Sequence, residues 1–145
     1  MIYPDLAFVL SLLVQGDQSE EASEILREVP HPLPLSPIHQ LQVENGLVRA
    51  FLGSSRHEAK VARDALLLWR EYLEEQIFII EKFDLDFAFA QAAAWNADFE
   101  FQPPRWSLLL HPAVALERKA TFLSFNPTLR KCARKAGLGL LPEKL

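Results

Sequence analysis

The stretch Thr121-Phe122-Leu123-Ser124-Phe125-Asn126-Pro127 joins an apolar strand to the start of a helix. Threonine and phenylalanine are enriched in strands, and proline is well suited to the first position of a helix, where its missing N–H would have no partner. The basic helix that follows runs to Ala136, and Gly137 ends it before a short strand at 139–141. Strands separated by helices in this way are typical of a parallel sheet.

The same alternation continues through the rest of the chain. Apolar residues at helical spacing, together with caps and β-branched runs, mark the elements. We expect strands at 2–6, 77–80, 121–125 and 139–141, and helices at 19–29, 37–52, 57–75, 84–95, 106–117 and 127–136. The first strand is expected to run directly into a further helical stretch. The prolines of segment 31–37 exclude a helix there, and 99–104 is a break. Because no hairpin signal joins two strands, we expect an α/β fold of three layers, with a mostly parallel central sheet flanked by helices.

Length and composition narrow the class of protein. A chain of 145 residues, half of them apolar, predicts a single domain over 1–145. The net charge of −4 weakens the case for a surface that coats nucleic acid, but it leaves room for a local basic patch. The single cysteine, Cys132, cannot form an internal disulfide, which favours a reducing, cytoplasmic location. The apolar run 6–14 is too short to cross a bilayer, so we expect no membrane association.

Three polar residues interrupt the apolar pattern. Asp5 follows the first strand and is surrounded in sequence by apolar residues, while Glu44 falls on the apolar stripe of the helix at 37–52. Asn126 follows the strand at 121–125, at the same edge of the sheet as Asp5. Carboxylates gathered at one sheet edge repel one another unless a cation such as Mg²⁺ or Mn²⁺ neutralises them. The pattern is therefore that of a metal-dependent phosphodiesterase site.

Each of these residues also has a structural interpretation. Asp5 can accept hydrogen bonds from backbone amides at the strand end, and Glu44 can pair with a lysine or arginine on the helix surface. Asn126 before Pro127 is a common helix cap. Only the three residues together favour a metal site.

Several short motifs resemble those of one protein family. In chain order they are Met1-Ile2-Tyr3-Pro4-Asp5, Ser36-Pro37 leading to Val43-Glu44-Asn45, Leu109-Leu110-His111, Phe122-Leu123-Ser124-Phe125-Asn126, Leu129-Arg130 and Ala136-Gly137-Leu138. Their order and spacing resemble PIN-domain proteins, especially the VapC-like toxins of bacterial toxin–antitoxin pairs. The resemblance spans nearly the whole chain.

The resemblance implies a parallel-sheet ribonuclease that depends on Mg²⁺ or Mn²⁺ held by three or four acids. Asp5 matches the first acid and Glu44 the second. The third is expected three residues before the histidine of the Leu-Leu-His motif, where this chain has Leu108. Asn126 replaces the fourth, and Ala7 replaces a hydroxyl residue. The candidate catalytic and metal-binding residues are therefore Asp5, Glu44 and Asn126.

An incomplete acidic site predicts weak or absent activity. Leucine cannot bind a metal ion, and an asparagine carbonyl is a poorer ligand than a carboxylate for a hard divalent cation. We therefore expect a degenerate PIN protein, in effect a pseudoenzyme. Two alternatives stay open: an active Mg²⁺- or Mn²⁺-dependent endoribonuclease toxin with an unusual site, and a non-catalytic α/β protein-binding module.

The resemblance also implies partners. An antitoxin-like protein, RNA and a second copy of the chain in a homodimer are expected, with the helices after Ser19 and Ser36 offering apolar surface to a partner. Six basic residues form a face that is better explained by solvation than by phosphate contacts: Arg118, Lys119, Arg130, Lys131, Arg134 and Lys135. His111 is expected in the core, and Cys132 is not expected to act as a nucleophile.

Overall fold

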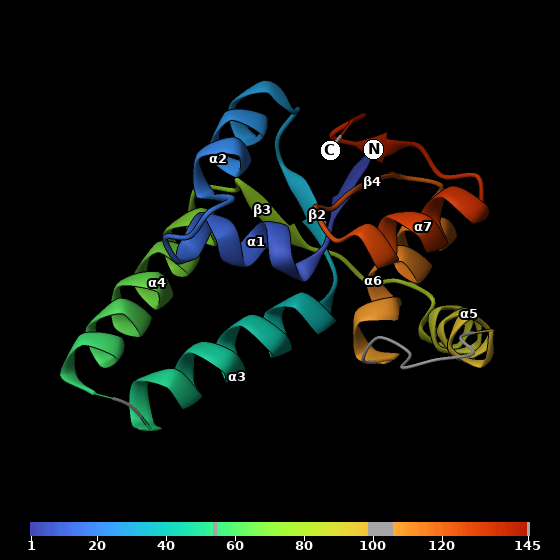
Figure 1. Ribbon diagram of the computed structural model, residues 1–145. Helices are drawn as coiled ribbons and strands as arrows, with labels where there is room; N and C mark the ends of the chain where they lie inside the picture. Colours follow the sequence, from blue (N-terminus) through green and yellow to red (C-terminus); the bar gives the residue numbers. More distant parts are fainter. Residues whose placement is uncertain (54, 99–105, 145) are drawn as a thin grey trace. The chain divides into compact units, whose positions relative to one another are not determined.

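The computed structural model describes residues 1–53, 55–98 and 106–144 (Figure 1). The chain forms two compact units. Unit 1 comprises residues 1–7 and 82–145, and unit 2 comprises residues 8–81. The expected single domain over 1–145 stays a prediction.

Unit 1 is built on a parallel sheet of three strands. They are β1 (Ile2–Pro4), β4 (Thr121–Leu123) and β5 (Leu140–Leu141), in the order β1-β4-β5. Ile2 is level with Thr121 and Pro4 with Leu123, so both strands end at the same edge of the sheet. The expected parallel sheet is therefore confirmed.

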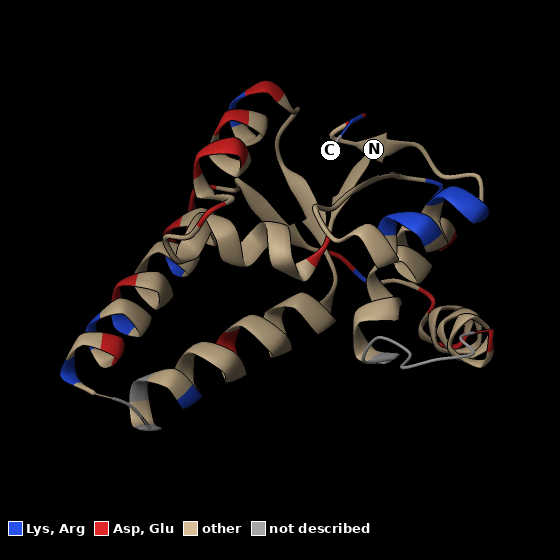
Figure 2. Ribbon diagram, in the orientation of Figure 1, with Lys and Arg blue, Asp and Glu red and all other residues tan. Residues whose placement is uncertain are grey.

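Unit 1 also contains three helices: α5 (Leu85–Ala97), α6 (Trp106–Glu117) and α7 (Pro127–Lys135). α5 packs against α6, and α6 packs against both α7 and β4. Leu109 of α6, Phe122 of β4 and Ala133 of α7 are fully buried, so the core of the unit lies between sheet and helices. The basic residues of α7 are visible in Figure 2.

Unit 2 contains most of α1 (Leu6–Leu13) and five further elements. These are α2 (Ser19–Glu28), β2 (Leu33–Leu35), α3 (Pro37–Gly53), α4 (Arg56–Glu74) and β3 (Phe78–Ile80). β2 and β3 pair in parallel. α3 packs against α4, whose first turn is closed by a capping box between Ser55 and Glu58. The outer face of α2 is acidic (Figure 2).

The strand β2 was not expected from the sequence, because Pro34 lies in its centre. Proline lacks an N–H, but the pairing with β3 does not need one at this position. The N–H of Leu33 donates to the carbonyl of Ile77, and the carbonyl of Leu35 accepts from Glu81, at 2.9 and 2.8 Å. Proline is tolerated in a strand where its nitrogen faces away from the paired strand.

The first strand is shorter than expected. β1 ends at Pro4 and α1 begins at Leu6, whereas the sequence predicted a strand to Leu6. The apolar run continues from strand into helix, so hydrophobicity alone does not mark the boundary. The other expected helices and strands agree within two residues, and the expected break at 99–104 lies outside the described residues.

No helix in the described part of the chain is both long and apolar enough to span a membrane.

Candidate functional site

Asp5 lies at the carboxyl end of β1, where its side chain is completely buried. Its backbone N–H donates to the carbonyl of Leu123 at 2.9 Å, which continues the pairing of β1 with β4 by one step. Its carboxylate Oδ2 accepts a short hydrogen bond from the hydroxyl of Ser124, the residue that directly follows β4. The ends of two neighbouring parallel strands thus bring a carboxylate and a hydroxyl together.

Ser124 also connects Asp5 to Asn126. Its hydroxyl oxygen accepts a hydrogen bond from the backbone N–H of Asn126 at 3.0 Å while its proton points to Asp5. The sequence therefore placed Asp5 and Asn126 correctly at one edge of the sheet. It did not identify Ser124 as the residue that links them, although Ser124 lies within the motif Phe122–Asn126.

Asn126 is the N-cap of α7. Its side-chain Oδ1 accepts hydrogen bonds from the backbone N–H groups of Thr128 and Leu129, at 2.9 and 3.1 Å. A carbonyl oxygen has two lone pairs, and here both are directed to amides of the helix. The remaining side-chain atom is the amide nitrogen, which is a donor and not a cation ligand. The structural interpretation of Asn126 as a helix cap is confirmed.

Arg130 ties the ends of β4 and β5 together from α7. Its Nη1 donates to the carbonyls of Ser124 and Leu141, at 2.9 and 3.0 Å, and its Nη2 donates to the carbonyl of Pro142 at 2.7 Å. Burial lowers the pKa of Arg130, and the positive charge of Arg134 lowers it further. The expectation of a solvated basic face is wrong for Arg130, which is only 4% exposed, because backbone carbonyls hold its guanidinium.

Glu44 lies on α3 in unit 2, where it is half-buried. Its Oε1 accepts hydrogen bonds from the indole Nε1 of Trp69 at 3.2 Å and from Nε2 of Gln40 at 3.3 Å. Within the described residues no lysine or arginine pairs with Glu44, so the alternative of an ion pair at the helix surface finds no support there. The acid is explained by an aromatic donor from the neighbouring helix, a partner that the sequence did not reveal.

The position of the expected third acid lies on α6 in unit 1. Leu108 is half-buried there, and His111, one turn later, is fully buried. Burial lowers the pKa of His111 to about 3, so the imidazole is neutral at physiological pH. The expected core role of His111 is confirmed.

Cys132 is also buried in unit 1. The pKa of its thiol is raised, chiefly by burial, while the nearby charges of Lys135 and Lys131 act in the opposite direction. A protonated, buried thiol is a poor nucleophile, in agreement with the expectation for Cys132.

The predicted metal ligands are distributed over both units. Asp5 and Asn126 belong to unit 1 and are linked through Ser124, whereas Glu44 belongs to unit 2. In the described residues no three His, Cys, Asp or Glu side chains are grouped so as to hold a metal ion. A joint metal site of Asp5, Glu44 and Asn126 stays a prediction.

No protein-family model matches the sequence, and no curated protein matches it significantly. Solved structures do share its fold. VapBC2 from Rickettsia felis, bound to a DNA fragment from its promoter, superposes with a TM-score of 0.63 at 15% identity over 97% of both chains. FitAcB from Neisseria gonorrhoeae gives a TM-score of 0.64 at 15% identity, over 99% of this chain and 98% of the other.

A further structure, FitAB bound to the IR36 DNA fragment, gives a TM-score of 0.67 at 15% identity, over 100% of this chain and 97% of the other. These are toxin–antitoxin complexes with PIN domains. At this level of identity the likeness concerns the fold. The expected PIN-like α/β fold, with a parallel sheet flanked by helices, is confirmed.

Proposed function

We propose that this chain is a degenerate VapC-like PIN protein of a toxin–antitoxin-type system, with weak or absent metal-dependent ribonuclease activity. In this proposal the fold is retained for binding an antitoxin-like partner. The fold it shares with the VapBC2 and FitAB complexes supports this class of protein.

The proposal rests mainly on the hydrogen bonding of the Asn126 side chain. Where the resemblance places an acid, this chain has an amide whose only side-chain oxygen already accepts two hydrogen bonds from α7. An aspartate in the same place would cap the helix with one oxygen and keep the other for a cation. The amide cannot do both, since its second terminal atom is a nitrogen.

Leu108 supports the same conclusion independently. The resemblance assigns an acid to this position of α6, and an aliphatic side chain can neither bind Mg²⁺ nor orient the attacking water. Two carboxylates remain, those of Asp5 and Glu44. Both already accept hydrogen bonds from side chains of the protein, so neither needs a cation as its partner.

Titration calorimetry with Mn²⁺ tests the proposal, with Glu44→Gln as the matched control because it removes the charge and keeps the shape. We expect no saturable heat at millimolar Mn²⁺ for either protein, and no RNA cleavage above the level seen with EDTA. Mn²⁺-dependent cleavage by the wild-type chain that disappears in Asp5→Ala would refute the proposal.

The burial of Asp5 favours a second candidate, an active endoribonuclease with an unusual site. A fully buried carboxylate is costly, and this cost is often retained where the charge is used. Under this alternative, expression of the chain arrests growth, and both Asp5→Asn and Glu44→Gln abolish the arrest. Arrest that persists in both variants would exclude a nuclease that uses these acids.

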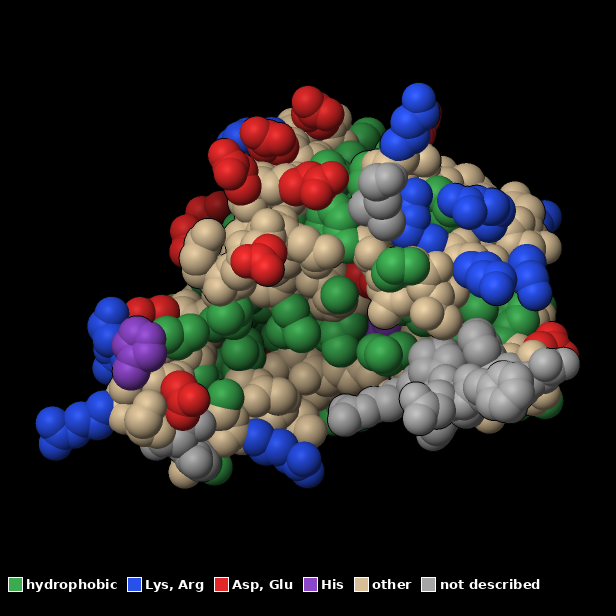
Figure 3. All heavy atoms as spheres, viewed as in Figure 1, with side chains coloured by type: hydrophobic (Ala, Val, Ile, Leu, Met, Phe, Trp, Pro, Cys, Tyr) green, Lys and Arg blue, Asp and Glu red, His purple; other side chains and the backbone are tan. Residues whose placement is uncertain are grey.

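Exposed apolar side chains support the proposed protein partner. On α3 these are Leu41, Val48 and Leu52, with exposed fractions of 69%, 43% and 77%. Hydrophobic side chains also gather on the face of unit 2 that Figure 3 shows. Of the two helices expected to offer apolar surface, α3 does so, whereas the outer face of α2 is acidic. An antitoxin-like protein, RNA and a second copy of the chain are all retained as proposed partners.

A further inference from the structure

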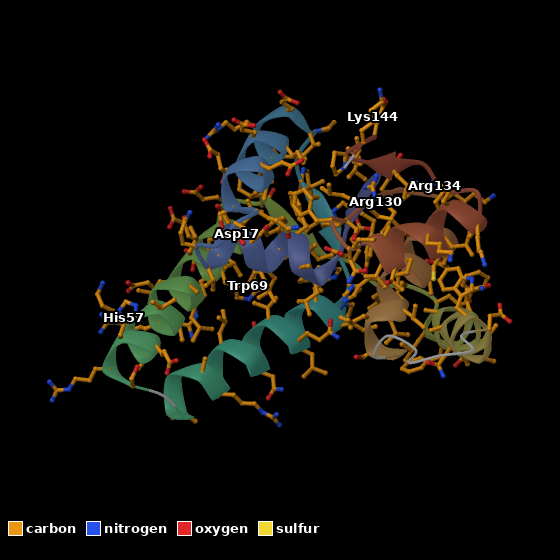
Figure 4. The ribbon with its side chains drawn as sticks, in the orientation of Figure 1. Asp17, His57, Trp69, Arg130, Arg134 and Lys144 are labelled. Carbon is orange, nitrogen blue, oxygen red and sulfur yellow. The ribbon has the colours of Figure 1, made fainter. Side chains whose placement is uncertain are left out.

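Unit 1 contains an open pocket between α7 and the C-terminal segment. Its volume is about 450 Å³, and it is lined by Pro127, Arg130, Arg134, Glu143 and Lys144. Lysine and arginine side chains gather over this part of the surface in Figure 3. Figure 4 labels the three cationic residues, two of which come from α7 and one from the C-terminal segment.

The pocket presents one face of α7. Pro127, Arg130 and Arg134 are spaced by three and four residues, which places their side chains in one row along the helix. Lys144 adds a third positive charge from the C-terminal segment, outside α7. Among the described residues of the lining, Glu143 is the only acid, so three cations and one carboxylate give these residues a formal charge of +2.

The positive charges of the pocket are not neutralised within the described protein. Nη1 and Nη2 of Arg130 donate hydrogen bonds to backbone carbonyls. These bonds hold the guanidinium in the pocket wall, and because the carbonyls are uncharged its positive charge remains. Neither Arg134 nor Lys144 forms an ion pair with any other described residue. The two guanidinium groups also repel each other, since the charge of Arg134 lowers the pKa of Arg130. A bound anion would relieve this repulsion.

We propose that this pocket of Arg130, Arg134 and Lys144 binds a phosphate group. A phosphate offers several oxygens and up to two charges, which matches cations that approach from two different elements. Arg134 can donate two parallel hydrogen bonds to such a group, and Lys144 acts as a compact point charge. The carboxylate of Glu143 repels a bound anion and therefore weakens the binding of highly charged ligands.

The phosphate has two possible sources, a free or terminal phosphate monoester and the diester backbone of RNA. Both present the same oxygens to the pocket. Phosphate binding at this pocket requires neither a metal ion nor RNA cleavage, so its test is independent of the test of the proposed function.

The first experiment is a ¹⁵N NMR titration of the full chain with sodium phosphate in EDTA, with sodium chloride holding the ionic strength constant. We expect saturable shifts in α7 and at residues 143–144. The double variant Arg134→Gln/Lys144→Gln should weaken binding by about tenfold or more, because two charge-assisted contacts are lost. Arg130 is left intact because it holds β4 and β5 together.

Two further variants make the test specific. Lys131→Gln removes one charge from an exposed position of α7 outside the pocket, and binding should stay within about twofold of wild type. Glu143→Gln should tighten binding, which a damaged fold would not do. Shifts that chloride alone reproduces, or an equal loss in Lys131→Gln and in the double variant, would overturn the proposal.

Short RNA distinguishes the two sources. Hexauridylate with a 5′-phosphate and with a 5′-hydroxyl is titrated under the same metal-free conditions. Tighter binding of the 5′-phosphorylated form supports a terminal monoester, and equal binding of both forms supports the diester backbone. If inorganic phosphate and both RNAs leave the pocket residues unshifted, the pocket is not a phosphate site.

Discussion

Trp69 on α4 donates its indole N–H to Oε1 of Glu44 on α3 across 3.2 Å. The bond joins the two packed helices of unit 2, and Trp69 itself is only 1% exposed. A half-buried carboxylate on an apolar stripe is thereby provided with a donor, which lowers the cost of its burial. Glu44 therefore contributes to the packing of α3 on α4.

Trp69→Phe tests this contribution to stability. We expect the free energy of unfolding to fall by about 1–3 kcal/mol, because the variant removes the indole donor and leaves part of a buried volume empty. Urea denaturation followed by circular dichroism measures the change. Glu44→Gln keeps an oxygen acceptor for the indole and should cost less, about 1 kcal/mol or below. A larger loss for Glu44→Gln than for Trp69→Phe would contradict this account.

A second prediction concerns the hydroxyl that meets Asp5. Ser124→Ala removes one donor to a fully buried carboxylate and should lower the free energy of unfolding by about 1–3 kcal/mol. Ser23→Ala serves as the control, because its hydroxyl donates only to a backbone carbonyl of its own helix, and it should change stability by about 0.5 kcal/mol or less. Equal effects of both variants in urea denaturation would mean that the bond to Asp5 adds nothing.

The sequence predicted the parts of the fold that carry their own local signals. The strand at 121–125 and its helix were found because Pro127 and Gly137 mark the helix ends. The strand at 33–35 was missed because Pro34 argues against a strand, and only the pairing with β3 shows that its missing N–H is not needed. Signals within one element are visible in sequence, and those that depend on a distant partner are not.

In the candidate site, too, the sequence predicted local features and missed contacts with distant residues. Asp5 and Asn126 were placed at one edge because parallel strands end together. The burial of Arg130 could not be read from sequence, because arginine is almost always exposed and its partners are carbonyls that any residue provides. The donor to Glu44 depends on how α3 docks on α4, and helical spacing within α3 contains no information about that contact.

The third prediction is a pH dependence that originates at His111. Its pKa is about 3 in the folded protein and about 6.5 when unfolded, so the unfolded state binds more protons between these values. Stability is unaffected above pH 6.5 and falls as the pH drops below it, by about 1.4 kcal/mol per unit. At pH 4.5 the wild-type protein should have lost about 2–3 kcal/mol through this group.

Urea denaturation at pH 7 and pH 4.5 measures the effect. Other groups titrate in the same range, so the readout is the difference between variants. His111→Leu should lose less stability on acidification than wild type, since it has no proton to take up, whereas His57→Gln at an exposed position should behave as wild type. Identical losses for His111→Leu and wild type would exclude His111 as the source.

The final prediction reverses the two replacements that define the proposed degenerate site. In Asn126→Asp one carboxylate oxygen can still accept from Thr128 and Leu129, so the cap of α7 should persist and the stability should stay within about 0.5 kcal/mol of wild type. Asn126→Ala removes the cap and should cost about 0.5–2 kcal/mol. The second oxygen of the aspartate, which the asparagine lacks, becomes available to a cation.

Leu108→Asp supplies the acid that the resemblance assigns to α6. We expect the double variant Leu108→Asp/Asn126→Asp to bind Mn²⁺ at least about tenfold more tightly than wild type, because hard divalent ions prefer carboxylate oxygens. Leu108→Asn/Asn126→Asp is the matched control, since it has the same shape and polarity as the double variant without the charge on α6, and titration calorimetry compares them. If the double variant is folded by circular dichroism and binds Mn²⁺ no better than the control, the missing acids are not the reason for weak metal binding.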